Sequence, residues 1–188
     1  MIRLRRIVIG SVCVLLAFPQ AFAFDNPPPI EAAQGSLQAA FAPWDDIEGL
    51  IMSAIDGANR QVLVQAYLLT DRRIAAALIA AQRRGIDVSV LADAEQFAKV
   101  ESSKLSELAA AGIPVWLETR YHSAHNKIIV IDAAAPDATV ITGSFNFTWS
   151  AQHTNAENVL IARNSPVLAA RYAANWERHR QQATPYKK

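Results

Sequence analysis

Cysteine is almost missing from this chain of 188 residues, which holds a single one, Cys13. One cysteine cannot form a disulfide within the chain, so the fold is no disulfide-stapled scaffold. Internal repeats are also missing, and the one biased stretch is the short proline run at residues 27–29. These absences exclude a repeat solenoid and leave an ordinary folded domain with a hydrophobic core.

Long apolar runs are missing after residue 23. Before it, three arginines within the first six residues precede an apolar run over residues 7–18, and small residues occupy positions 21 and 23. This order is typical of a secretory signal peptide cleaved after Ala23, which predicts a periplasmic or secreted protein. A membrane anchor is the alternative, but the run is shorter than the ~20 residues that span a bilayer. We therefore expect no stable membrane insertion after cleavage.

An excess of charge of one sign is missing too. Lys and Arg number 18 against 17 Asp and Glu, and removal of residues 1–23 takes away three arginines, which leaves 15 against 17. The resulting formal charge of −2 gives no general electrostatic attraction to nucleic acid. Any nucleic-acid site must therefore depend on a local cluster of positive charge.

What the sequence does contain is an alternation of strand and helix patterns. Residues 61–69 are apolar on both faces, as in a central strand with helices on each side. Asp45 or Asp46, and later Asp71, are positioned to cap helices with apolar stripes. The remaining strands are expected at 37–41, 86–92, 113–117, 138–142 and 157–163, and the remaining helices at 101–111 and 166–181. This order predicts an α/β fold, with a mixed, central β-sheet flanked by helices on both faces.

The same patterns divide the chain into four parts. Residues 1–23 are the expected signal peptide, and residues 24–36 form a proline-containing arm or linker. Residues 37–182 hold the folded domain, and residues 183–188 form a basic tail. All of the candidate catalytic residues fall within the third part.

The segment from His125 to Asp132 carries the first candidate site residues. Its run of β-branched residues predicts a strand, in which His125 and Lys127 project from one side of the sheet and Asp132 from the other. Histidine can act as a nucleophile or as an acid and base, and lysine can neutralise an anion. This pair therefore indicates a site for an anionic substrate.

A turn after the next predicted strand supplies Gly143, Ser144 and Asn146, and the last two share a side if the chain stays extended. Glu157 begins the following strand. A carboxylate there could accept the Nδ1 proton of His125 and leave Nε2 free to attack. A nucleophile, a cation and two neutral hydrogen-bonding groups suit a phosphodiester substrate.

A metal site is the alternative for the histidines. His122, His125 and His153 could bind a metal together with Asp132, but a spacing of three makes His122 and His125 diverge in a strand. The chain also offers no cysteine or second acidic cluster beside them. We therefore expect no metal.

Basic and aromatic residues near the site allow two interpretations each. A solvated helix face and tail is the simpler interpretation of the C-terminal cations, and contact with substrate phosphates is the other. The aromatic residues next to the motif could stack on a base or pack a dimer interface. These residues are Arg171, Arg178, Arg180, Lys187 and Lys188 for the cations, Trp149 and Tyr121 for the aromatics, and Arg120 at a possible entrance.

The pattern His125-x-Lys127-x4-Asp132, followed by Gly-Ser-Phe-Asn at 143–146, resembles the HxKx4D…GS motif of the phospholipase D superfamily. Residues 143–148 and 155–158 are similar to the small, secreted, single-motif bacterial endonucleases of that superfamily. The resemblance runs from about residue 37 to residue 181. The chain departs from the larger members in the loop at 133–137, which lengthens the spacing between Asp132 and Gly143 to ten residues.

The resemblance implies a mechanism that needs neither a metal nor a cofactor. One motif histidine attacks phosphorus and forms a phosphohistidine, and a second protonates the leaving oxygen and then activates water. The catalytic residues would be His125, Lys127, Ser144, Asn146 and Glu157. Lys127, Ser144 and Asn146 would also bind the phosphoryl oxygens. Asp132 and Gly143 would serve the motif structurally.

The resemblance also implies a homodimer, because the mechanism needs two motif histidines and each chain has one. A two-fold interface would bring the two His125 side chains together in one composite cleft. The expected activity is a metal-independent, non-specific endonuclease acting on DNA, with RNA as a further substrate. Phospholipase D activity on phospholipid head groups and non-catalytic nucleic-acid binding are the alternatives.

Overall fold

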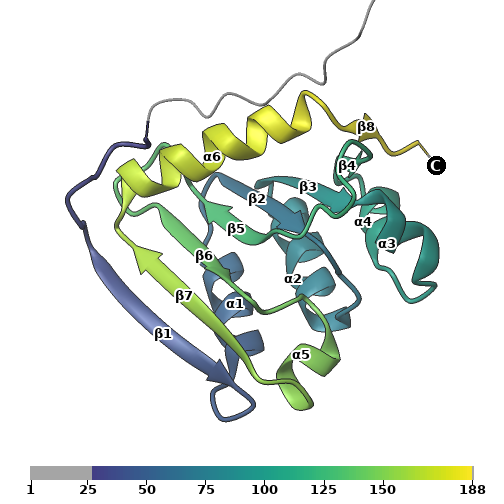
Figure 1. The fold of residues 1–188 in the computed structure, drawn as a ribbon, viewed down its shortest axis with the longest axis horizontal. Coiled ribbons are helices and arrows are strands. Elements are labelled where there is room, and N and C mark those ends of the chain that lie inside the picture. The colour runs from purple at the N-terminus through teal and green to yellow at the C-terminus, as the bar shows by residue number, and fades with distance from the viewer. Residues whose placement is uncertain (1–26, 188) are drawn as a thin grey trace, which may run out of the picture. The chain divides into compact units, whose positions relative to one another are not determined.

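A computed structural model describes residues 27–187 of the chain, and residues from Ala32 onward form one folded unit built on a single eight-stranded sheet. The strands lie in the order β1-β7-β6-β5-β2-β3-β4-β8 (Figure 1). The pairs β2–β3 and β3–β4 are parallel and the other neighbours are antiparallel, which confirms the predicted mixed sheet. The strands are β1 Ser36–Ala42, β2 Gln61–Ala66, β3 Asp87–Asp93, β4 Val115–Glu118, β5 Lys127–Ile131, β6 Thr139–Gly143, β7 Glu157–Arg163 and β8 Thr184–Pro185.

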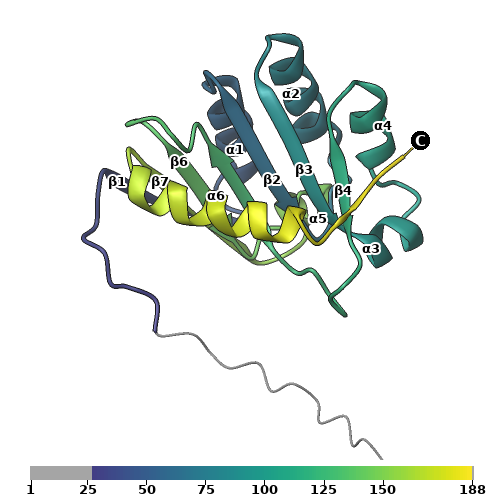
Figure 2. The same ribbon diagram turned by 90° about the horizontal axis from the view of Figure 1, so that it is seen from above.

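Helices cover both faces of the sheet, as predicted. Figure 2 shows α1 and α2 on one face and α6 on the other. β2 lies between these layers and is buried along nearly its whole length, because its alternate side chains enter two separate apolar clusters. The helices are α1 Ile47–Asp56, α2 Arg72–Arg83, α3 Ala94–Lys99, α4 Leu105–Ala110, α5 Trp149–His153 and α6 Pro166–Arg180.

The predicted aspartate caps explain where two of these helices begin. The side chain of Asp46 accepts a hydrogen bond from the backbone N–H of Gly49, and Asp71 accepts from those of Arg73 and Ile74. A side-chain oxygen at this position satisfies backbone donors that have no partner within the helix. α6 begins at Pro166, where the missing N–H of proline is tolerated.

Two segments differ from the expectation. The helix expected over 101–111 forms as the shorter α4. An additional helix, α3, was not expected; it begins directly after β3 because Asp93 caps it by accepting from the backbone N–H of Gln96. The expected basic tail at 183–188 contains β8, which extends the sheet beside β4. Tyr186 continues this attachment by donating its backbone N–H to the carbonyl oxygen of Val115 at 2.8 Å.

The expected signal peptide at residues 1–23 lies outside the described residues. Within residues 27–187, none of the helices combines the length and the apolar character that crossing a bilayer requires.

The strand directions bring several segments together at one edge of the sheet, which we call the site edge. β5 is antiparallel to both β2 and β6, so its first residue, Lys127, lies beside the last residues of those strands, Ala66 and Gly143. β7 is antiparallel to β6, and so its first residue, Glu157, lies at the same edge. Residues that are far apart in sequence therefore meet where β5 begins.

Candidate active site

His125 and Lys127 form the centre of the site edge. His125 precedes β5 and is exposed, whereas Lys127 is the first residue of β5 and is only 6% exposed. The Nζ atom of Lys127 lies 2.9 Å from Nδ1 of His125 and donates to the carbonyl oxygen of His125 at 2.8 Å. The structure thus brings the two predicted residues together, although His125 lies outside the strand that was expected to align them.

Tyr67 is a site residue that the sequence reasoning missed. Its ring centroid lies 4.3 Å from that of His125, and Nζ of Lys127 lies 4.8 Å from the centre of the Tyr67 ring. The backbone N–H of Tyr67 donates to the carbonyl oxygen of Asn126, which joins the end of β2 to the start of β5. No local signal in the sequence indicates this role, because Tyr67 falls within the strand expected over 61–69. Tyr67 restricts the imidazole and adds a cation–π contact to the lysine.

Burial changes the charge behaviour of Lys127. Desolvation favours the neutral amine, and it lowers the pKa of Lys127 to about 8, against a smaller opposing effect of the Glu157 carboxylate. The amine is therefore still mostly protonated at neutral pH. A cation held out of water at this place interacts strongly with a bound anion.

The prediction that the Glu157 carboxylate accepts the Nδ1 proton of His125 is wrong, because Glu157 has other partners. Its Oε2 atom accepts a hydrogen bond from the Ser144 hydroxyl at 2.5 Å, and Oε1 accepts from Asn155. The Ser144 oxygen in turn accepts from the backbone N–H of Asn158 at 3.1 Å. The reason for the difference is that His125 lies before β5, where the adjacent Lys127 takes the position next to Nδ1.

The turn after β6 carries Gly143 and Asn146. A Cβ atom at Gly143 would come within 2.2 Å of the carbonyl oxygen of Asn158, so only glycine permits this close approach of β6 and β7. The Oδ1 atom of Asn146 is buried and has no hydrogen-bond partner among residues 27–187. Because this oxygen is buried, the part of the Asn146 side chain that remains for a bound group is its amide N–H₂, on the turn after β6.

Asp132 lies at the far end of β5 from His125. It is 4% exposed and accepts three backbone hydrogen bonds, from Asn59 at 2.8 Å, Arg60 at 2.7 Å and Gln61 at 2.8 Å. Its φ angle of 52° places it in the left-handed region, which aspartate tolerates better than most residues. The structure thus gives Asp132 a role in fixing the start of β2 against the end of β5.

The other predicted histidines do not join this group into a metal site. His122 is exposed in the segment that leads to His125. His153 ends α5, and its ring stacks on Trp149 with 4.4 Å between the ring centroids. Within the part of the chain that the structure describes, no three His, Cys, Asp or Glu side chains gather closely enough to hold a metal ion.

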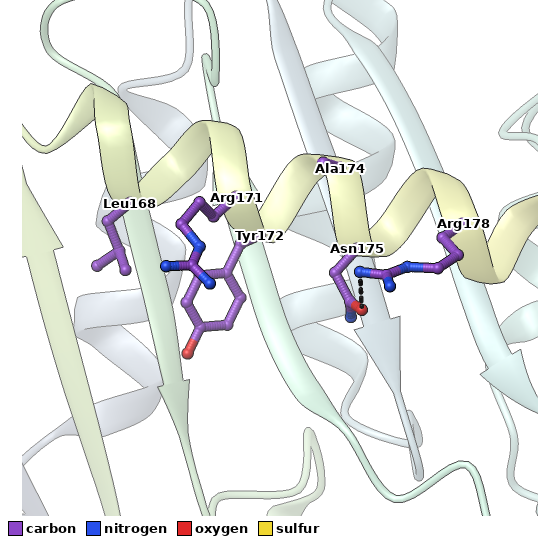
Figure 3. A pocket seen from close by; sticks show the side chains of 6 residues that line it. All are labelled: Leu168, Arg171, Tyr172, Ala174, Asn175 and Arg178. Carbon is purple, nitrogen blue, oxygen red and sulfur yellow. Dashed lines mark hydrogen bonds between the residues drawn. The ribbon is translucent and has the colours of Figure 1, made fainter. Parts of the chain in front are cut away.

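Two of the predicted C-terminal cations line a hollow of about 470 Å³ on α6. Figure 3 shows Arg171 and Arg178 along the same side of the helix, on either side of Asn175. Arg178 Nη2 lies 3.5 Å from Oδ1 of Asn175, and Tyr172 and Leu168 complete this wall. Arg180 instead pairs with Glu177 on its own helix. Arg171 and Arg178 are thus the cations of the set that the structure places together.

The grouping at the site edge suits chemistry on a phosphodiester. The exposed imidazole of His125 can attack phosphorus or donate a proton, and the buried cation of Lys127 can neutralise negative charge on the phosphoryl oxygens. Ser144 and Asn146 add neutral hydrogen-bonding groups on the neighbouring turn. Comparison with known proteins agrees with this chemistry.

The fold and this set of residues define a phosphodiesterase of the phospholipase D class. Residues 51–180 match the family model described as "Cardiolipin synthase, PLD-like domain". The chain therefore belongs to the phospholipase D superfamily, as the motif predicted, and it is a phosphodiester hydrolase of that family.

The similar proteins include a phospholipase D, a cardiolipin hydrolase and the solved structure of Nuc. The chain is 40% identical to a phospholipase D of Rickettsia prowazekii over 146 residues, which are 78% of this chain and 68% of that protein. It is 30% identical to a mitochondrial cardiolipin hydrolase of Xenopus laevis over 122 residues, or 65% of this chain and 55% of that protein. Among solved structures, it resembles Nuc, a phospholipase D family member from Salmonella typhimurium, with a TM-score of 0.74 and 32% identity, over 81% of this chain and 99% of Nuc.

Proposed function

We propose that this protein is an exported, metal-independent endonuclease that cleaves DNA, and also RNA, in a composite site of a homodimer. The observation that carries the proposal is the contact between the exposed His125 and the buried Lys127 at the site edge, where the central strand β5 begins. An exposed imidazole at such an edge is accessible both to a long polymer and to a second copy of the chain.

The mechanism follows from the chemistry of these groups. Nε2 of one His125 attacks phosphorus and forms a P–N bond, while the His125 of the partner chain gives a proton to the leaving oxygen as the P–O bond breaks. That second histidine then takes a proton from water, whose oxygen attacks phosphorus and releases the first imidazole. Lys127, with the amide N–H₂ of Asn146, stabilises the additional negative charge on the phosphoryl oxygens in both steps, and Ser144 joins them when its hydroxyl turns from Glu157 to the substrate.

We favour nucleic acid as the substrate because of the similarity of the residues around the site and the similarity in size. The residues around Ser144 and Glu157 resemble those of small single-motif bacterial endonucleases, and the chain covers nearly all of Nuc. Phospholipid head groups are the second candidate, because the relatives include proteins named phospholipase D and cardiolipin hydrolase. Both substrates are phosphodiesters, so the difference must lie in contacts outside the reacting group.

A parallel assay separates these substrates. The mature protein from residue 24 onward would be incubated with EDTA and with double-stranded DNA, single-stranded DNA, RNA or phosphatidylcholine vesicles. We expect cleavage of the nucleic acids to persist in EDTA. Cleavage of phosphatidylcholine alone would support the lipid alternative, and loss of all cleavage with recovery on addition of a divalent cation would contradict the metal-free mechanism.

Export is part of the same proposal. It depends on the N-terminal sequence, in which arginines, an apolar run and small residues follow one another before Phe24. Expression of the full chain with analysis of the periplasm and the medium tests it. We expect a product whose mass begins at Phe24, whereas a retained full-length protein in the cytoplasm would contradict export.

A further inference from the structure

A cavity of about 470 Å³ lies beside the turn that carries Asn146, on the other side of the sheet from α6. It is lined by Glu48, Thr70, Asp71, Arg72, Arg73, Trp149 and His153. The carbonyl oxygen of Phe147 accepts backbone hydrogen bonds from Thr70 and Asp71 at 3.0 Å, so this cavity and the Ser144–Asn146 turn share a backbone connection. Tyr67, which contacts His125, precedes Thr70 of the cavity wall by three residues, so the Cα atoms of Tyr67 and Thr70 are at most about 11 Å apart.

One wall of the cavity is an aromatic platform. The rings of Trp149 and His153 stack with an interplanar angle of 9° and centroids 4.4 Å apart, and Nδ1 of His153 lies 2.9 Å from the carbonyl oxygen of Trp149. Trp149 is 58% exposed despite this stacking. A large aromatic ring that is held rigidly and still exposed is suited to stack on a second planar group.

The polar groups of the cavity are arranged by depth. Glu48 and Asp71 are buried at 2% and 6% exposure, and Oε1 of Glu48 has no hydrogen-bond partner among the described residues. Arg72 and Arg73 are exposed, and Arg73 also bonds Oε2 of Glu48 at 3.3 Å. The buried carboxyl groups disfavour a phosphate in the deep part of the cavity, while the outer arginines can contact phosphates on either side of a bound base.

We propose that this cavity is a nucleobase subsite, in which an unpaired base next to the cleaved phosphodiester stacks on Trp149. The inference rests on the proposed nuclease function and adds the group that selects its substrate. A base within a duplex cannot reach the platform without unstacking, so single-stranded stretches are the preferred substrates. The scissile phosphate itself remains at His125 and Lys127.

The test compares Trp149→Ala with Trp44→Ala, because Trp44 is also exposed but lies outside the cavity. Each variant would be assayed on a single-stranded oligonucleotide and on an abasic oligonucleotide of the same length, which keeps the phosphodiesters but has no planar group to stack. Stacking is worth about 1–3 kcal/mol per base, so we expect Trp149→Ala to lose roughly 5- to 150-fold in kcat/KM on the oligonucleotide. Activity of Trp149→Ala on the abasic oligonucleotide should equal that of the wild type, and Trp44→Ala should match the wild type on both substrates.

A second measurement does not depend on turnover. In a His125→Ala background, an oligonucleotide that contains 2-aminopurine should lose fluorescence on binding, and additional replacement of Trp149 by Ala should abolish that loss. Unchanged cleavage and unchanged fluorescence in the Trp149 variants would overturn the subsite, as would equal losses on both substrates. A wild-type protein that cleaves bis(p-nitrophenyl) phosphate but no oligonucleotide would instead contradict the proposed nuclease function.

Discussion

Nζ of Lys127 lies 2.9 Å from Nδ1 of His125. When the lysine is protonated it donates to this nitrogen, so a neutral imidazole must carry its own proton on Nε2. In that state Nε2 can donate a hydrogen bond to the substrate but cannot attack phosphorus. Attack needs a neutral imidazole with its proton on Nδ1, and proton donation to the leaving oxygen needs an imidazolium with both nitrogens protonated. Both roles therefore require that Lys127 no longer donates to Nδ1, so its ammonium is free to contact the phosphoryl oxygens.

Replacement of either residue of this pair is predicted to remove activity without unfolding the protein. His125→Ala loses the attacking and proton-donating group, and we expect a fall of at least about 1,000-fold in kcat. Lys127→Met keeps the length of the side chain but loses the cation, and we expect a fall of about 100- to 1,000-fold. Cleavage of bis(p-nitrophenyl) phosphate measures both, with circular dichroism as the check on folding.

His122→Ala is the matched control for these variants. His122 is exposed and lies three residues before His125, outside the contacts of the site. We expect near wild-type activity from it. A near-normal rate in His125→Ala, or a large loss in His122→Ala, would show that the reacting histidine has been assigned wrongly.

The alkaline limb of the pH profile should report on Lys127. Its pKa is lowered to about 8, so the cation is present below that pH and is lost above it. We predict that kcat/KM, which follows groups of the free enzyme, declines above about pH 8. In Lys127→Arg, any residual activity should lack this decline because arginine keeps its proton. An unchanged alkaline limb in that variant would exclude Lys127 as its source.

Lys127 should make the free energy of unfolding rise over the pH range in which kcat/KM falls. The unfolded lysine retains its proton up to its usual pKa of 10.5, whereas the folded one loses it near 8. Between these values the unfolded state binds more protons, so this residue makes the free energy of unfolding rise with pH. Urea denaturation at pH 8 and pH 10 therefore separates the loss of a catalytic cation from loss of the fold.

The sequence predicted the sheet well because burial dominates its pattern. β2 is apolar on both faces, and that pattern alone places it between two helical layers. Asp46 and Asp71 were identifiable as caps because capping depends on residues close in sequence. α3 was missed because Asp93, which caps it, also accepts a hydrogen bond from the backbone N–H of Ala124, a contact made only in the folded chain.

The site was predictable as a set of residues but not as a set of contacts. Strand parity could relate His125 to Lys127 only if both lay in one strand, and His125 precedes β5. The partner of Glu157 depends on the close approach of β6 and β7 at Gly143, which no local pattern reports. Tyr67 was missed for the same reason, since its contact with His125 arises from the pairing of β2 with β5.

We predict that Asp132 stabilises the fold. Asp132→Ala leaves the backbone N–H groups of Asn59, Arg60 and Gln61 without their acceptor, and it places alanine at a φ angle of 52°. We expect a loss of about 2–4 kcal/mol in the free energy of unfolding, measured in urea. Asp137→Ala in the same loop is the control, because Asp137 is exposed, and its effect should stay within about 0.5 kcal/mol. Equal effects of the two changes would contradict the role given to Asp132.

The composite site makes a quantitative prediction for mixed dimers. Wild-type chains and His125→Ala chains would be co-expressed with different tags, and the heterodimer would be purified through both. If one cleft needs both His125 side chains, the heterodimer has lost one of its two reacting groups and should retain less than about 1% of wild-type activity. If each chain instead has an independent site, the heterodimer keeps half of the activity. A wild-type protein that is monomeric by light scattering and fully active would contradict the composite site directly.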